Sequence, residues 1–167
     1  MRSKEPQTHT TTIDAQLSDG RVDAAVPDAT APDATVPDAQ PQLTLIDTVT
    51  IEVDGTVVDS VAVLQAGQTY LLRVSGVFQI TSAGALSDAE YWDNAGTFSD
   101  TVSGIDVGVA INDTVVDGNK TPHWGAYNAS HIYEVNFVGT GAVIATMVHD
   151  GNLTNNVGNL TLEIYSQ

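Results

Sequence analysis

The fold is decided by a stretch over residues 43–64, which reads LTLIDTVTIEVDGTVVDSVAVL. Apolar and polar side chains alternate through its first half, and a period of two residues is typical of a half-buried β-strand. The apolar face of this strand carries Leu45, Val49, Ile51 and Val53. Asp54-Gly55 follows, and this dipeptide favours the positive φ values of a tight hairpin turn. The stretch therefore predicts a β-hairpin whose return strand runs from Thr56 to about Leu64.

The same alternation recurs toward the C-terminus. It is found over residues 70–78, 105–111, 131–138, 142–148 and 160–164. Seven or eight short strands at this spacing predict an all-β domain over residues 43–167, an antiparallel jelly-roll-like β-sandwich. The longest connections in it are 81–104, 114–130 and 149–158. Because loops on rigid β scaffolds carry most functional residues, we expect a binding site in these three segments.

The first 42 residues differ in composition from the predicted domain. They hold five of the six prolines and no aromatic residue, and three units over residues 26–40 read VPDAT, APDAT and VPDAQ. Proline fixes its own φ and favours extended geometry in the residue before it. We therefore expect an extended, low-complexity linker or stalk that is rich in Pro, Asp and Ala. One alternative is that residues 8–13 pair as a strand with a neighbouring subunit.

Charge and composition exclude several functions. Acidic residues number 21 against 5 Lys plus Arg, and the net charge is -16. Such a field repels phosphate groups, so we expect no nucleic-acid partner. No apolar run has the length of a membrane helix, so no direct membrane insertion is expected. The chain has no Cys, which excludes thiolate metal sites and cysteine nucleophiles. Beyond residue 42 only Arg73 and Lys120 are basic.

The richest cluster of oxygen ligands lies between two predicted strands, over residues 149–159 (HDGNLTNNVGN). It offers the Asp150 carboxylate, several asparagine amides, a threonine hydroxyl and backbone carbonyls. Ca²⁺ binds six to eight such oxygens and accepts neutral amide and carbonyl ligands. Zn²⁺ would need more His or Cys. An ordinary Asn-rich hairpin turn would have the same composition, so on the motif alone both interpretations stay open.

Two segments resemble the PA-IL-like family of calcium-dependent, galactose-binding bacterial lectins. Residues 137–164, read as strand, Asp150, short loop, Asn155-Asn156-x-Gly158 and strand, resemble the C-terminal part of that family. Residues 64–76 are similar to its opening strands. The resemblance implies a jelly-roll sandwich with Ca²⁺ held by Asp150, Asn155 and Asn156. It also implies one carbonyl ligand from Asn152 or Leu153, and a second carbonyl after Phe78, which we expect within residues 88–91.

In that family the calcium ion binds two sugar hydroxyls directly, so the resemblance implies that Asp150 and Asn155 also take part in sugar recognition. The further candidates for contacting a carbohydrate are His149, Asp88, Tyr91 and Trp92. Trp124 could also stack on a sugar, although a tryptophan in such a loop more often packs into one end of the sandwich as part of the core. The leading hypothesis is a non-enzymatic, calcium-dependent carbohydrate-binding module on a stalk, which is extracellular or at the cell surface.

Its partners would be glycans or glycoconjugates, and a homo-oligomer or filament would add avidity. Five Asn-x-Ser/Thr sequons would make it a glycoprotein where such sites are modified. One alternative is a calcium-stabilised structural subunit of a cell-surface filament or adhesin. Another is a glycoside-active enzyme that uses Asp88, Glu90 or Asp93.

Overall fold

The structure, a computed structural model, describes residues 42–112, 115–116 and 119–167. The chain divides between Pro37 and Asp38, and every described residue belongs to the second unit. The predicted stalk and the possible strand over residues 8–13 lie outside the described residues. Among the described residues, no helix has the length and apolar character that crossing a bilayer would require.

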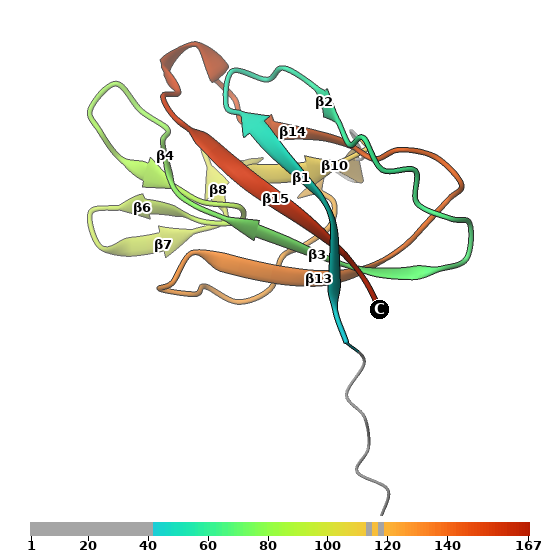
Figure 1. Ribbon diagram of the computed structural model, residues 1–167. Helices are drawn as coiled ribbons and strands as arrows, with labels where there is room; N and C mark the ends of the chain where they lie inside the picture. The colour runs from blue at the N-terminus through green and yellow to red at the C-terminus, as the bar shows by residue number, and fades with distance from the viewer. Residues whose placement is uncertain (1–41, 113–114, 117–118) are drawn as a thin grey trace, which may run out of the picture. The chain divides into compact units, whose positions relative to one another are not determined.

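One layer of the domain is a four-stranded antiparallel sheet (Figure 1). Its strands in spatial order are β1 (Thr44–Glu52), β15 (Asn159–Ser166), β3 (Thr69–Ser75) and β13 (Ile132–Val138). Burial alternates along β3 and β15, so that every second side chain faces the interior. This confirms the strands that the period of two predicts around residues 70–74 and 160–164.

A second layer lies behind the first in Figure 1, where β10 and β14 run side by side. Its order is β10 (Gly108–Ile111), β14 (Ala145–His149) and β2 (Val58–Asp59). Smaller antiparallel pairings join β4 (Phe78–Gln79), β5 (Leu86–Ser87), β6 (Trp92–Asn94) and β7 (Thr97–Ser99). Two further pairs are β8 (Thr101–Val102) with β9 (Ile105–Asp106), and β11 (Val115–Val116) with β12 (Asn119–Lys120).

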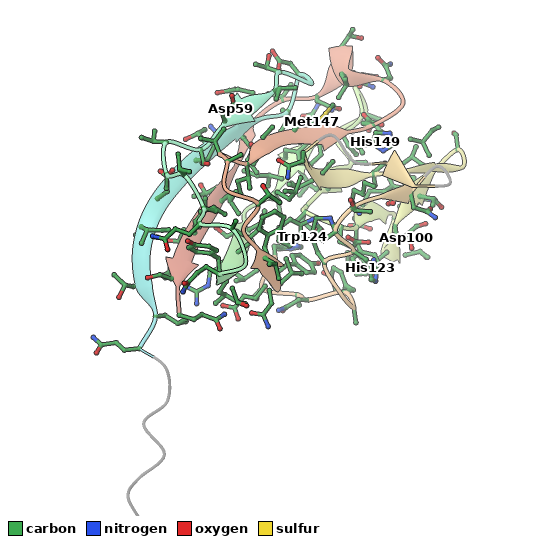
Figure 2. All side chains as sticks on the ribbon, turned by 90° about the vertical axis from the view of Figure 1, so that its right-hand side faces the viewer. Asp59, Asp100, His123, Trp124, Met147 and His149 are labelled. Atoms are coloured by element: carbon green, nitrogen blue, oxygen red, sulfur yellow. The ribbon has the colours of Figure 1, made fainter. Side chains whose placement is uncertain are left out.

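The hydrophobic core fills the space between the two layers. Leu72 and Ile164 come from the first sheet, Val109 and Val148 come from the second, and all four are 0% exposed. Trp124 is buried among them and its indole Nε1–H donates to the carbonyl of Val109 at 2.8 Å. Figure 2 shows Trp124 inside the sandwich, so this ring has the core role expected for it and does not form a sugar platform. The chain is an all-β sandwich with antiparallel sheets.

The predicted hairpin at Asp54-Gly55 is wrong. Gly55 has the expected positive φ of 85°, but the turn carries the chain from one layer to the other. β1 pairs with the last strand of the chain, whereas β2 pairs with β14. The turn residues fix the local reversal of the chain, but burial of the apolar face of β1 against the core decides which strand lies beside it.

Two details of the alternation also differ. The register of β1 shifts between Leu45 and Asp47, so that Leu45 is 49% exposed while Val49 is buried. A bulge of one residue moves the side chains before it to the opposite face. The stretch 105–111 is two strands with different partners: β9 pairs with β8, whereas β10 begins at Gly108, whose φ is 115°, and pairs with β14.

Candidate functional site: an oxygen-lined loop

The loop between β14 and β15 begins at Asp150 and contains a single 3₁₀ turn over Leu153–Asn155. Asn152 caps this turn, because its Oδ1 accepts from the Thr154 backbone N–H at 3.3 Å and from the Thr154 hydroxyl at 2.8 Å. Capping by an asparagine side chain is a common way to begin a short helical turn. The amide oxygen of Asn152 is therefore already hydrogen-bonded.

Three side-chain oxygens in this loop are buried and have no hydrogen-bond partner. They are Oδ2 of Asp150, Oδ1 of Asn155 and Oδ1 of Asn156. A buried polar atom without a partner costs about 1–3 kcal/mol, and more when the group is charged. Buried polar groups in native proteins are nearly always paired, so three such acceptors within seven residues need an explanation. Carboxylate and amide oxygens that lack hydrogen-bond donors are the type of group that coordinates a hard cation.

Neighbouring segments hold the loop in place. The Asn156 side-chain Nδ2 donates to the carbonyl of Val53 at 2.9 Å, which fixes the amide with its oxygen on the other side. Val157 exchanges two backbone hydrogen bonds of 2.9 Å with Gln79. The side chain of Leu153 packs over Gly55, where a Cβ atom would come within 2.4 Å of the leucine Cδ1. The oxygens are therefore held on a supported backbone.

Asp150 and Asn155 open into a hollow of about 380 Å³. Its other walls come from the segment that follows β4 and from the β8–β9 hairpin: Ile80, Thr81, Val102, Ser103 and Ile105. Sequence reasoning did not identify these wall residues, because they are separated from the loop by more than 40 positions. The hollow places apolar side chains beside a group of oxygens. Ligand pockets commonly combine an apolar wall with a few polar groups in this way.

The donor set fits calcium better than other metals. It has one carboxylate, two amide oxygens and nearby backbone carbonyls, and all of these are hard oxygen ligands. The described residues contain no group of three or more His, Cys, Asp or Glu side chains suited to a metal. A Zn²⁺ site is of that type, whereas a Ca²⁺ site built from amides and carbonyls is not. The carbonyl ligand from Asn152 or Leu153 stays a prediction, and the Leu153 carbonyl accepts one long bond of 3.5 Å from the Asn156 N–H.

The structure does not bring the other predicted sugar-contacting residues to this hollow. Asp88 and Tyr91 line a different pocket, and the two pockets have no lining residue in common. The indole N–H of Trp92 donates to the carbonyl of Thr101 at 2.8 Å, and the ring packs against the core. Nδ1 of His149 contacts the carbonyl of Asp106. Ile80 and Thr81 line the hollow in place of residues 88–91. The Thr81 carbonyl already accepts from the Gly84 N–H and from the Gln79 side-chain amide, each at 2.9 Å, so the second carbonyl ligand stays a prediction.

A buried ionic cluster was also not predicted. Nζ of Lys120, which is 0% exposed, lies 2.7 Å from Oε2 of Glu90 and 3.1 Å from Oδ1 of Asp106. Nδ1 of the exposed His123 lies 2.5 Å from the other Glu90 oxygen. His123 and Asp100 line the same pocket beside this cluster, and Figure 2 shows both toward one edge of the molecule. The sequence signal that could have indicated it is that Lys120 is one of two basic residues in the domain.

Asp88 and Glu90, two of the carboxylates that the enzyme hypothesis uses, are both buried, and both take part in several hydrogen bonds. Oδ1 of Asp88 accepts from the backbone N–H groups of Glu90 and Tyr91 at 2.9 and 2.7 Å. Glu90 binds Lys120 and also accepts from the backbone N–H of Trp124 at 2.9 Å. Carboxylates in such networks hold neighbouring segments together.

Comparison with known proteins leaves the family of this chain open. No family model, no curated protein and no solved structure matches it.

Proposed function

We propose that this domain is a calcium-dependent carbohydrate-binding module, and that its activity is binding without catalysis. The observation that carries the proposal is the set of three buried, unpartnered oxygens on Asp150, Asn155 and Asn156. These are the residues for which the sequence resemblance implies calcium ligation. The resemblance comes from the sequence pattern, whereas the missing hydrogen-bond partners come from the geometry of the loop. Two different kinds of observation therefore support a metal site at the same three residues.

The charge distribution favours a cation at this site. Of the two basic side chains beyond residue 42, Arg73 binds Glu134 at 2.6 Å and Lys120 is enclosed between two carboxylates. Neither lines the hollow next to Asp150. When bound, Ca²⁺ would supply a fixed positive charge to which hydroxyl oxygens can coordinate.

The hollow suits a neutral sugar. Ile80, Val102 and Ile105 would contact the apolar C–H face of the ring, while a calcium ion held by Asp150 and Asn155 would take its hydroxyl groups. We propose vicinal hydroxyls as the recognised group, with galactose as the sugar that the resemblance implies. A single site of this kind binds weakly, so we expect repeated copies on an extracellular or cell-surface protein.

The test is binding to a glycan array in the presence of Ca²⁺, then with a chelator. We expect binding to neutral glycans that disappears with the chelator and in the variant Asp150→Asn. The matched control is Asp59→Asn, which removes one charge from an exposed position on β2. An array that stays blank under both conditions would refute the lectin proposal, while calcium-dependent stability could still hold.

A second candidate is a calcium-stabilised structural subunit. β1 forms an edge of the four-stranded sheet, and near its start Leu43, Leu45 and Ile46 are 39–49% exposed. An edge strand with exposed apolar residues favours pairing with another chain. Sedimentation velocity with the full chain tests it: concentration-dependent assembly that Leu45→Lys prevents would favour this candidate, and a monomer at all concentrations would count against it.

A further inference from the structure

A second pocket of the domain differs in chemistry from the hollow beside Asp150. It is built by the β6–β7 hairpin and the loop that precedes β13, which lie close together in Figure 1. Its volume is about 120 Å³, and its lining includes the side chains of Tyr91, Phe98, Tyr127, His131, Asp88 and Asp93. None of these residues lines the hollow beside Asp150.

Four rings, those of Tyr91, Phe98, Tyr127 and His131, contribute to its walls. Phe98 stacks on Tyr127 with ring centroids 3.7 Å apart, and the ring of Tyr91 stands at 90° to that of Tyr127 at 5.8 Å. His131 meets the edge of Tyr127 at 6.0 Å. These rings pack directly against one another beside the pocket. The face of an aromatic ring carries negative charge density, so ring faces left open to the pocket attract cations.

The charged groups of the pocket point to the same ligand. Asp88 and Asp93 are carboxylates, and no Lys or Arg lines the pocket. Burial raises the pKa of Tyr127, and the negative charges of Asp88 and Asp93 raise it further. An anionic ligand would be repelled by these groups, whereas a cation would be attracted.

The hydrogen bonds of Asp88 narrow the choice of cation. Oδ2 of Asp88 accepts from Tyr133 Oη and His131 Nδ1, each at 2.8 Å, and its Oδ1 accepts two backbone N–H groups. With two donors on each oxygen, this buried carboxylate offers charge rather than a free acceptor. A primary ammonium needs acceptors for its three N–H groups when it leaves water, but a quaternary trimethylammonium group has no N–H and needs none.

The pocket is also held in a fixed shape and has a limited size. His131 has a φ of 53°, a left-handed conformation that is costly for a non-glycine residue, and its side chain is anchored on Asp88. A cavity of roughly 150 Å³ holds one benzene ring of six heavy atoms. A volume of 120 Å³ therefore suits a group of about five heavy atoms, such as a trimethylammonium group, and is small for a hexose.

We propose that this aromatic pocket binds the methylated ammonium group of a small organic cation. Tyr91, Phe98 and Tyr127 supply ring faces, and Asp88 and Asp93 supply negative charge. The site acts independently of the calcium loop.

The test is titration of the whole protein with choline, and with 3,3-dimethyl-1-butanol, in which carbon replaces the charged nitrogen. Aromatic proton NMR signals report binding. We expect saturable shifts with choline and at least about tenfold weaker binding of the neutral alcohol, because only the cation gains from the ring faces and carboxylates. Equal affinity for choline and the neutral alcohol would overturn the proposal. So would the absence of any shift with choline at about 50 mM, which sets the upper limit for the dissociation constant of the site.

Two variants assign the site. Phe98→Leu should weaken choline binding about 2- to 30-fold, and Asp93→Asn should weaken it at least about threefold. Phe98 is 41% exposed, so its replacement leaves the core intact. The controls are Tyr165→Leu on β15 and Asp59→Asn on β2. Choline binding that is unchanged in Phe98→Leu, or that requires Ca²⁺, would contradict a separate aromatic site.

Discussion

Asp150→Asn gives the sharpest test of the calcium loop, because it should change stability in opposite directions with and without the metal. Without calcium, the wild-type loop carries a buried carboxylate oxygen that has no hydrogen-bond partner. Asparagine has the same shape but no charge, so the cost of burying an unpaired negative charge is removed. The variant should then be more stable than the wild type in a chelator, by about 1–3 kcal/mol.

With calcium the order should reverse. An ion that binds only the folded protein, at a thousand times its dissociation constant, stabilises it by about 4.1 kcal/mol. For a domain of this length, 1 kcal/mol shifts the melting temperature by roughly 4 °C, so the wild type should gain roughly 15 °C. The variant has lost its only charged ligand in the loop and should gain little.

Thermal unfolding followed by circular dichroism measures both effects. Ionic strength must be matched, and Mg²⁺ should be run beside Ca²⁺, because a net charge of -16 responds to any divalent ion. Asp59→Asn should keep the full calcium response. If calcium stabilises Asp150→Asn as much as the wild type, the loop is not the metal site. If the variant is much less stable than the wild type in the chelator, the carboxylate has a stabilising partner and the reasoning from its burial fails.

Three further variants test the rest of the fold. Lys120→Met leaves the carboxylates beside it buried and unpaired, so it should lower the free energy of unfolding, measured in urea, by about 3–5 kcal/mol. Arg73→Met, which removes a partly exposed ion pair, should lower it by less than about 1 kcal/mol. Similar losses in the two variants would contradict the role given to burial. Burial raises the pKa of Tyr133, so above pH 10 the folded state keeps the phenol proton that the unfolded chain loses. The free energy of unfolding should therefore fall by up to about 1.4 kcal/mol per pH unit in this range. If Tyr133→Phe shows the same dependence of stability on pH, Tyr133 is not its cause. Gly108→Ala should lower the melting temperature strongly, because a Cβ would lie 2.1 Å from the Ala89 carbonyl oxygen at a φ of 115°, and normal stability would show that the two backbones are farther apart.

Local pattern predicted the strands well but not their partners. Alternation identified the buried faces of β3 and β15, because the side-chain period depends only on neighbouring residues. It failed at Asp54-Gly55, where a hairpin-like turn connects two different layers. Pairing depends on long-range burial, and a turn dipeptide contains no information about it.

The candidate site divides in the same way. Asp150, Asn155 and Asn156 were recognisable because all of them lie in one short loop. The walls at Ile80 and Val102, and the pocket that unites Phe98 with Tyr127, come from distant segments that only the fold brings together. The Asp88 and Tyr91 side chains have chemistry suited to binding, and the fold assigns them to a pocket away from the loop.

The most direct measurement is a crystal structure of the protein grown with Ca²⁺, with an anomalous difference map calculated for the loop. The account predicts one strong peak at about 2.3–2.6 Å from Oδ2 of Asp150, Oδ1 of Asn155 and Oδ1 of Asn156. A map without a peak there, in which the three oxygens accept hydrogen bonds from neighbouring protein groups or from water, would contradict it.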